Sequence, residues 1–200
     1  MTLLELVVAL TITGLALSSG YEAFGTLADR RMAEEARANA VARTVSIRAS
    51  LVSWLSNARL TIEEDDIVFR GLDGVHKSTD NDLPDDDLTF FTSAETPVGN
   101  HGTIIRLHVE RSDTAASRGL IADLTEWHGT RTLRLPIDTA VGGLNGEYLS
   151  SVLGGHRWLA SWVSSSVLPA GVRVTLTPFP GDSLAPLMRM PMTVSLENGR

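Results

Sequence analysis

The side chains best suited to acid–base or metal chemistry gather in one stretch of the chain. Ten of its 24 acidic residues lie between positions 63 and 87, mostly in the runs Glu63–Asp66 and Asp80–Asp87. Calcium takes about six to eight oxygen ligands, so the second run is a candidate calcium loop. It lacks the glycine that an EF-hand loop requires, and Pro84 interrupts it. We therefore interpret both runs as solvated loops, with calcium at 80–87 as the less favoured alternative.

The histidines and glycines show no spacing that is typical of a catalytic or metal site. No pair of histidines has metal-ligand spacing on a helix, and the five are His76, His101, His108, His128 and His156. The chain has no cysteine, which excludes thiolate zinc sites, cysteine nucleophiles and disulfides. The run Gly142–Gly146 has the wrong spacing for a phosphate loop and is predicted to form a turn. We expect no catalytic residue, no metal and no cofactor, and the chain is not expected to be an enzyme.

Charge is distributed very unevenly along the chain. The net charge of −7 argues against a phosphate-binding surface, so no nucleic-acid partner is expected. Residues 1–24 carry only Glu5 and Glu22, and the run Leu6–Tyr21 is uncharged. As a helix this run spans about 24 Å, slightly less than the hydrocarbon core of about 30 Å, and extension to Leu27 makes it long enough. No basic residue precedes it, unlike in a signal peptide, so residues 1–27 are predicted to form a membrane-spanning helix.

Glu5 is the polar residue of this segment that most needs a partner, because burying a lone carboxylate costs several kcal/mol. In an isolated helix it lies in the first turn, where the helix dipole favours an anion. Alternatively, it pairs with the N-terminal amine of a neighbouring subunit and sets the stagger of packed helices. The residues alone leave both interpretations open.

Residues 28–60 are predicted to continue the helix, because they contain good helix formers and neither glycine nor proline. Apolar or small residues recur there at spacings of three and four, which predicts one stripe laid on a globular body. The stripe consists of Ala40, Thr44, Ile47, Leu51, Trp54, Leu55 and Ala58.

From residue 61 the period changes to two, which is typical of half-buried strands. The predicted strands are Ile67–Phe69, Leu88–Phe91, Thr103–Glu110, Gly119–Trp127, Thr132–Ile137, Val172–Leu176 and Met190–Leu196. Pro136 confines its strand to a sheet edge or a strand end. A long helix followed by a run of strands indicates an α+β fold with a mostly antiparallel sheet in residues 61–200.

The segment Met1–Leu10 resembles the mature N-terminus of type IV pilins and type II secretion pseudopilins. Its Thr-Leu-Leu-Glu core precedes a long apolar run, although Met1 stands where the family more often has Phe. The resemblance implies that prepilin peptidase exposes the Met1 amine, which is then methylated, and that Glu5 neutralises that amine on an adjacent subunit. No leader precedes Met1, so the chain is either the processed form or begins at a mis-chosen Met. The implied subunit-packing residues are Leu3, Leu4, Leu6, Val7 and Leu10.

The second half resembles the C-terminal region of J-type minor pseudopilins, through Gly146–Tyr148, Trp158–Trp162 and Leu168–Leu176. This implies a structural subunit of the pseudopilus tip, anchored by a single pass in the inner membrane with a periplasmic body. The implied partners are I-, K- and H-type minor pseudopilins and the major pseudopilin. Trp158 and Trp162 are candidate interface anchors, with core packing as the alternative. The alternative function is that of a minor type IV pilin for pilus assembly, adhesion or DNA uptake.

Overall fold

The computed structural model describes residues 2–60, 69–77, 82–99, 102–111, 118–152 and 155–196. Within these ranges, it does not describe the side chains of Glu5, Ala16, Ser19, Gly20, Glu22, Ala23 and Val152. The chain divides into two compact units, Met1–Arg43 and Thr44–Arg200. The expected segment boundaries after residues 27 and 60 stay predictions.

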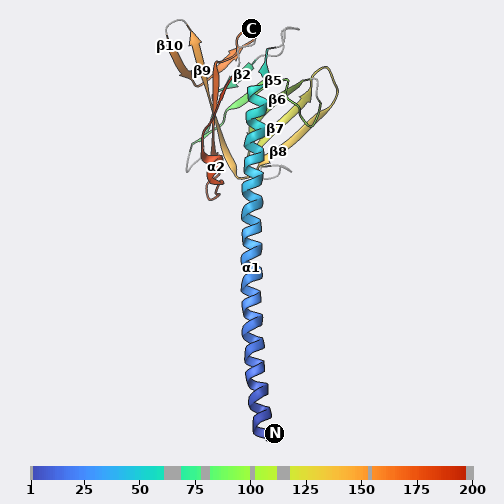
Figure 1. The fold of residues 1–200 in the computed structure, drawn as a ribbon. Coiled ribbons are helices and arrows are strands. Elements are labelled where there is room, and N and C mark those ends of the chain that lie inside the picture. Colours follow the sequence, from blue (N-terminus) through green and yellow to red (C-terminus); the bar gives the residue numbers. More distant parts are fainter. Residues whose placement is uncertain are drawn as a thin grey trace. The chain divides into compact units, whose positions relative to one another are not determined.

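A single helix, α1 (Leu3–Ser56), spans 54 residues (Figure 1). It ends slightly earlier than the predicted residue 60, because the chain turns at Asn57 into the short strand β1 (Ala58–Arg59). The burial of Leu51, Trp54 and Leu55 confirms the later part of the predicted apolar stripe. Its first residue, Ala40, is exposed, and its last, Ala58, is buried in β1 and not in the helix. Among the described residues, no helix is long and apolar enough to cross a membrane. The membrane-spanning first half of the helix therefore stays a prediction.

Within the described residues, the body contains three sheets, and their strands pair antiparallel. The largest has the order β11-β2-β5-β6-β7-β8, with β1 also paired to β5. Its other strands are β2 (Phe69–Leu72), β5 (Asp87–Thr92), β6 (Thr103–Glu110), β7 (Gly119–Glu126), β8 (Thr132–Asp138) and β11 (Trp162–Ser164). The predicted α+β class with mostly antiparallel sheets is confirmed, and Pro136 lies on the edge strand β8 as expected.

The second sheet has four strands in the order β10-β9-β12-β13. They are β9 (Val141–Val152), β10 (Gly155–Leu159), β12 (Gly171–Pro178) and β13 (Met192–Ser195). A two-stranded sheet pairs β3 (Val75–His76) with β4 (Leu83–Pro84), and the short helix α2 (Pro186–Arg189) precedes β13.

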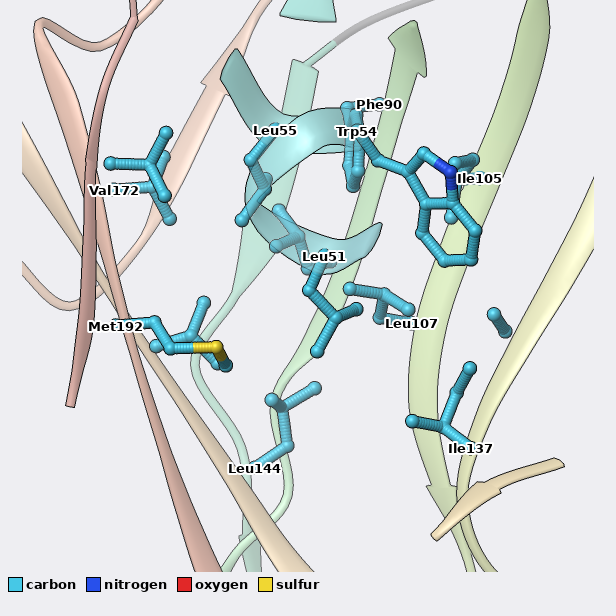
Figure 2. Packing of buried hydrophobic residues seen from close by; sticks show 14 of the residues in the cluster. Leu51, Trp54, Leu55, Phe90, Ile105, Leu107, Ile137, Leu144, Val172 and Met192 are labelled. Carbon is cyan, nitrogen blue, oxygen red and sulfur yellow. The ribbon is translucent and has the colours of Figure 1, made fainter. Parts of the chain in front are cut away.

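The core forms where the end of α1 lies between the two larger sheets. Figure 2 shows Leu51 and Leu55 between Val172 and Met192 on one side and Leu107 on the other. All five side chains are nearly fully buried. Each contributes about 1.5–3 kcal/mol by leaving water, so the last turns of α1 belong to the core of the body.

The glycine-rich run Gly142–Gly146 does not form the predicted turn but lies inside β9, the longest strand. A Cβ on Gly143 would lie 2.9 Å from the Cδ of Pro84, and one on Gly146 would lie 2.6 Å from the Tyr148 hydroxyl. Gly143 therefore allows Pro84 to approach β9 closely, and Gly146 leaves room for the Tyr148 side chain of the same strand. Glycine occurs inside strands where another group approaches the backbone closely. The turn prediction is wrong because the sequence does not show which segments pack against this run.

Candidate functional site

The predicted packing residues lie on the first turns of α1, and their side chains are 50–84% exposed. They are Leu3, Leu4, Leu6, Val7 and Leu10. Because successive helical residues are rotated by about 100°, these side chains point to several sides of the helix. Met1 lies outside the described residues, and Glu5 lies in α1 with its side chain undescribed. The roles expected for both stay predictions.

Two threonines in this apolar stretch turn their hydroxyl groups back onto the helix. The Oγ1 of Thr11 donates to the carbonyls of Val7 (3.0 Å) and Val8 (2.9 Å), and that of Thr13 donates to the carbonyl of Ala9 (2.8 Å). Such bonds satisfy the hydroxyl within the helix itself. The two hydroxyls therefore need no partner from outside, which suits a surface that packs against apolar groups.

The structure places Trp158 and Trp162 in different sheets, on β10 and β11. The guanidinium of Arg173 lies 4.4 Å from the centroid of the Trp158 ring and forms two hydrogen bonds, of 2.6 and 2.9 Å, with Glu147. Trp162 packs against the core, and its Nε1 donates to the carbonyl of Val167 (3.1 Å). Both indole rings are half-buried. They do not form a joint aromatic surface, and their role as interface anchors stays a prediction.

The acidic run contains a buried carboxylate that the sequence analysis missed. Asp86 is 2% exposed and accepts hydrogen bonds from the N–H groups of Gly74 (3.0 Å) and Gly146 (2.6 Å). Burial raises the pKa of Asp86 above its ordinary value, and these two hydrogen bonds only partly oppose the effect. The solvated-loop interpretation is therefore wrong for this residue. Its position two residues before buried Leu88, in phase with the strand, was an available signal.

The carboxylates beside Asp86 are engaged by arginines. Arg111 forms an ion pair with Asp85 and also donates to the carbonyl of Gly142 (2.9 Å) on β9. Arg106 forms an ion pair with Asp87 at 2.6 Å. These contacts make residues 85–87 a junction between the two larger sheets.

Nothing in the described part of the chain supports calcium at 80–87, although Asp80 and Asn81 lie outside it. Within that part, no three acidic or histidine side chains are grouped so that they could hold a metal ion. Asp82 is exposed, and the next three carboxylates of the run have the partners given above. Calcium at 80–87 therefore stays the less favoured alternative.

Charged side chains on the outer face of the seven-stranded sheet pair with one another across strands. Arg134 lies 3.0 Å from Glu110 and 3.7 Å from Asp123, and His108 lies 3.6 Å from Asp123. Burial lowers the pKa of His108, so its neutral form is favoured. Exposed pairs of this kind contribute only about 0–1 kcal/mol each. In these pairs, however, the charged groups already have partners within the same chain.

An open hollow of about 440 Å³ lies beside the loop between β12 and α2. Its lining consists of Arg118, Thr139, Ala140, Gly181, Asp182 and Ser183. Arg118 pairs with Asp182 at 2.5 Å and lies 4.1 Å from the centroid of the Phe179 ring. The cation of this hollow is therefore already engaged, which makes the hollow a poor anchor for a charged cofactor.

The strongest candidate for a functional surface is therefore the apolar first half of α1, whose large side chains are exposed. It offers a large apolar contact area, and such surfaces are typical of contacts with proteins or membranes. A search against protein-family models found none that matches the chain, and a search of curated proteins also found no match.

Proposed function

We propose that the chain is a J-type minor pseudopilin, a structural subunit of the pseudopilus tip in type II secretion. In this role the first half of α1 lies in the inner membrane and packs against the helices of neighbouring subunits, while the body lies in the periplasm. The neighbours are I-, K- and H-type minor pseudopilins and the major pseudopilin, and prepilin peptidase processes the chain. The role is one of assembly and needs no catalytic residue, metal or cofactor.

The exposure of large apolar side chains along the first half of α1 carries this proposal. Each of the twelve is between 48% and 84% exposed: Leu3, Leu4, Leu6, Val7, Val8, Leu10, Ile12, Leu15, Leu17, Tyr21, Phe24 and Leu27. A continuous apolar surface of this length on a soluble monomer is rare, and such surfaces mark contacts with proteins or membranes. At about 25 cal/mol per Å² of buried area, its removal from water is a strong driving force for assembly.

Glu5 gives the assembly its register in this proposal. An unpaired carboxylate surrounded by apolar helices costs several kcal/mol, so only arrangements that bring it a cation are stable. The amine of residue 1 on a neighbouring subunit supplies that cation. The position of Glu5 within the first turns of α1 supports the pairing, because a small stagger between parallel helices brings the two groups together.

The test is complementation in a host whose copy of the gene has been deleted. We expect the deletion to abolish secretion of an exoprotein and to leave twitching motility intact. Wild type restores secretion, whereas Glu5→Leu does not, because the variant lacks the group that selects the register. The matched control is Glu22→Leu, which removes the other acid of the first 24 residues and is expected to restore secretion.

Each other outcome contradicts a specific part of the proposal. If Glu5→Leu secretes as well as wild type, Glu5 does not set the register. If the deletion abolishes twitching motility and spares secretion, the chain is a minor type IV pilin. If both processes survive the deletion, the assembly proposal is wrong.

A further inference from the structure

The two N–H groups that bond to Asp86 belong to glycines that follow reactive side chains. Gly74 follows Asp73, and Gly146 follows Asn145. In both dipeptides the main-chain nitrogen of the glycine can attack the side-chain carbonyl carbon of the residue before it and close a succinimide ring. Glycine makes this attack easiest, because it has no Cβ to hinder the approach and leaves the main chain free to rotate.

The packing of the body requires glycine at both positions. A Cβ on Gly74 would lie 2.4 Å from the carbonyl oxygen of Asp85, and one on Gly146 would lie 2.6 Å from the Tyr148 hydroxyl. Both distances are too short for a carbon atom, so a larger residue would force the neighbouring groups to move. The two reactive dipeptides are therefore a consequence of the fold, and the fold has to keep them from reacting.

Asp86 holds both glycine nitrogens in place. Its Oδ1 accepts from the N–H of Gly74 at 3.0 Å, and its Oδ2 accepts from the N–H of Gly146 at 2.6 Å. Main-chain bonds fix the same segments, since the N–H of Asp85 donates to the Gly74 carbonyl (2.8 Å) and that of Asp86 donates to the Leu144 carbonyl (3.0 Å). A glycine nitrogen attacks only after it loses its proton and rotates toward the preceding side chain. The hydrogen bonds oppose both changes.

The two dipeptides differ in their surroundings. Asn145 lies inside β9, opposite Thr175 of β12. The extended main chain of a strand, with ψ of about +135°, directs the nitrogen of Gly146 away from the Asn145 side chain. Asp73 is exposed and lies between β2 and β3, so its protection depends chiefly on the hydrogen bonds of the following glycine. Asp86 is the one carboxylate bonded to both glycines.

We propose that Asp73 and Asn145 are latent sites of succinimide formation, and that Asp86 keeps both unreactive in the folded chain. At Asn145, the nitrogen of Gly146 forms a bond to Cγ, its proton passes to a solvent base, and the side-chain nitrogen takes a proton from water and leaves as ammonia. At Asp73 the same ring closes with loss of water. Water then opens either ring at one of its two carbonyl carbons and leaves aspartate or isoaspartate.

The product at position 145 shows what the protection preserves. Isoaspartate adds a methylene group to the main chain, so the residues of β9 that follow it lose their register with β12. Among them is Tyr148, whose side chain is fully buried in the core. The inference is independent of the proposed function, since it concerns the chemical lifetime of the body.

The experiment follows both sites in the purified full-length chain, kept in mild detergent at slightly alkaline pH. Incubation in heavy-oxygen water labels every ring that has formed and opened, and mass spectrometry measures the label against time. Trypsin separates the sites, because it cleaves after Arg70 and Lys77 around one and after Arg134 and Arg157 around the other. For Asp86→Ala we expect both sites to react about tenfold faster than in wild type or more, the change that corresponds to loss of a hydrogen bond to a charged group.

Two controls separate this effect from a general loss of stability. Leu51→Ala weakens the core but leaves Asp86 and its two hydrogen bonds in place, so we expect the wild-type rate at both sites. Asp82→Ala removes an exposed acid of the same run and should also react at the wild-type rate. In concentrated urea every variant should react at one common rate at each site, because none of these hydrogen bonds remains.

A further variant keeps part of the protection. Asp86→Asn retains one side-chain oxygen as an acceptor and places an NH2 group, which cannot accept, where the other oxygen was. We therefore expect faster reaction at one of the two sites. This variant decides the question if Asp86→Ala does not fold, and wild-type rates at both sites would then overturn the inference.

The remaining outcomes are equally decisive. Wild-type rates at both sites in folded Asp86→Ala overturn the inference, as do equal accelerations in Asp86→Ala and Leu51→Ala. It is also overturned if the folded wild type reacts as fast as the chain in urea. None of these measurements depends on secretion, so the proposed function stands or fails separately.

Discussion

The buried carboxylate of Asp86 provides the sharpest test of how the body is held together. Replacement by alanine leaves the N–H groups of Gly74 and Gly146 without the acceptor that they have in the wild type. Each buried unsatisfied donor costs about 1–3 kcal/mol. Relief of the carboxylate's desolvation offsets part of this sum, so we expect Asp86→Ala to lower the free energy of unfolding by about 2 kcal/mol. For a chain of this size the melting temperature then falls by roughly 4–8 °C.

The pH dependence of stability tests the same reasoning about Asp86. Most acidic residues make a folded chain more stable as pH rises, whereas Asp86 is expected to make it less stable. Burial raises the folded-state pKa above 3.8, so the folded chain binds this proton at a higher pH than the unfolded chain does. The stability gained from protonation of Asp86 is fully present below pH 3.8, the pKa in the unfolded chain, and is lost as pH rises through the folded-state pKa. Asp86→Asn lacks this titration. Wild type should therefore lose stability relative to Asp86→Asn as pH rises above 3.8 and through the folded-state pKa.

The assay is urea unfolding of the full chain in mild detergent, followed by tryptophan fluorescence, because Trp54 is buried in the core. The matched control is Asp82→Ala, which removes an exposed acid of the same run and should change stability by less than about 0.5 kcal/mol. The reasoning is refuted if Asp86→Ala unfolds at the wild-type midpoint. It is also refuted if the stability of wild type increases relative to that of Asp86→Asn as pH rises.

Two further substitutions test the packing. Gly71→Ala should lower the free energy of unfolding by about 3 kcal/mol or more, because the new Cβ would lie 1.9 Å from the Tyr148 hydroxyl. The control Gly25→Ala, on an open side of α1, should not lower it. Leu51→Ala should cost about 2–5 kcal/mol by opening a cavity between the sheets, whereas Val163→Ala at an exposed site should cost less than about 0.5 kcal/mol. Urea unfolding measures all four. Equal midpoints for the Leu51 pair would contradict the packing that Figure 2 shows, and equal midpoints for the glycine pair would contradict the close approach of Tyr148 to Gly71.

The sequence predicted those parts of the fold that depend on local periodicity. The alternation in Thr103–Glu110 places Ile105 and Leu107 in the core, and the three- and four-residue spacing places Leu51 there as well. These patterns suffice because each element has one buried face, whose period is fixed by helix or strand geometry.

Features that depend on contacts between distant segments could not be read in this way. Asp86 is buried because Gly74 and Gly146, which lie 12 and 60 residues away along the chain, supply its hydrogen bonds. Gly143 lies in a strand rather than a turn because it pairs with Thr177 on β12, 34 residues further along the chain. In both cases residue type alone favoured the wrong interpretation, since acids and glycines are usually found on the surface and in turns. The candidate surface of α1 could be predicted from the sequence, because it depends only on a long run without charged residues.

The edge strand β8 has a consequence for the assembly proposed above. Exposed sheet edges invite uncontrolled strand addition, and proline and bulges are two devices that blunt them. β8 has both, since Pro136 lies within it and the register with β7 shifts between Leu120 and Ile121. A subunit that assembles through its helix has to avoid aggregating through its sheet. The blunted edge therefore disfavours aggregation by strand addition, so that the proposed assembly grows through contacts of the helix.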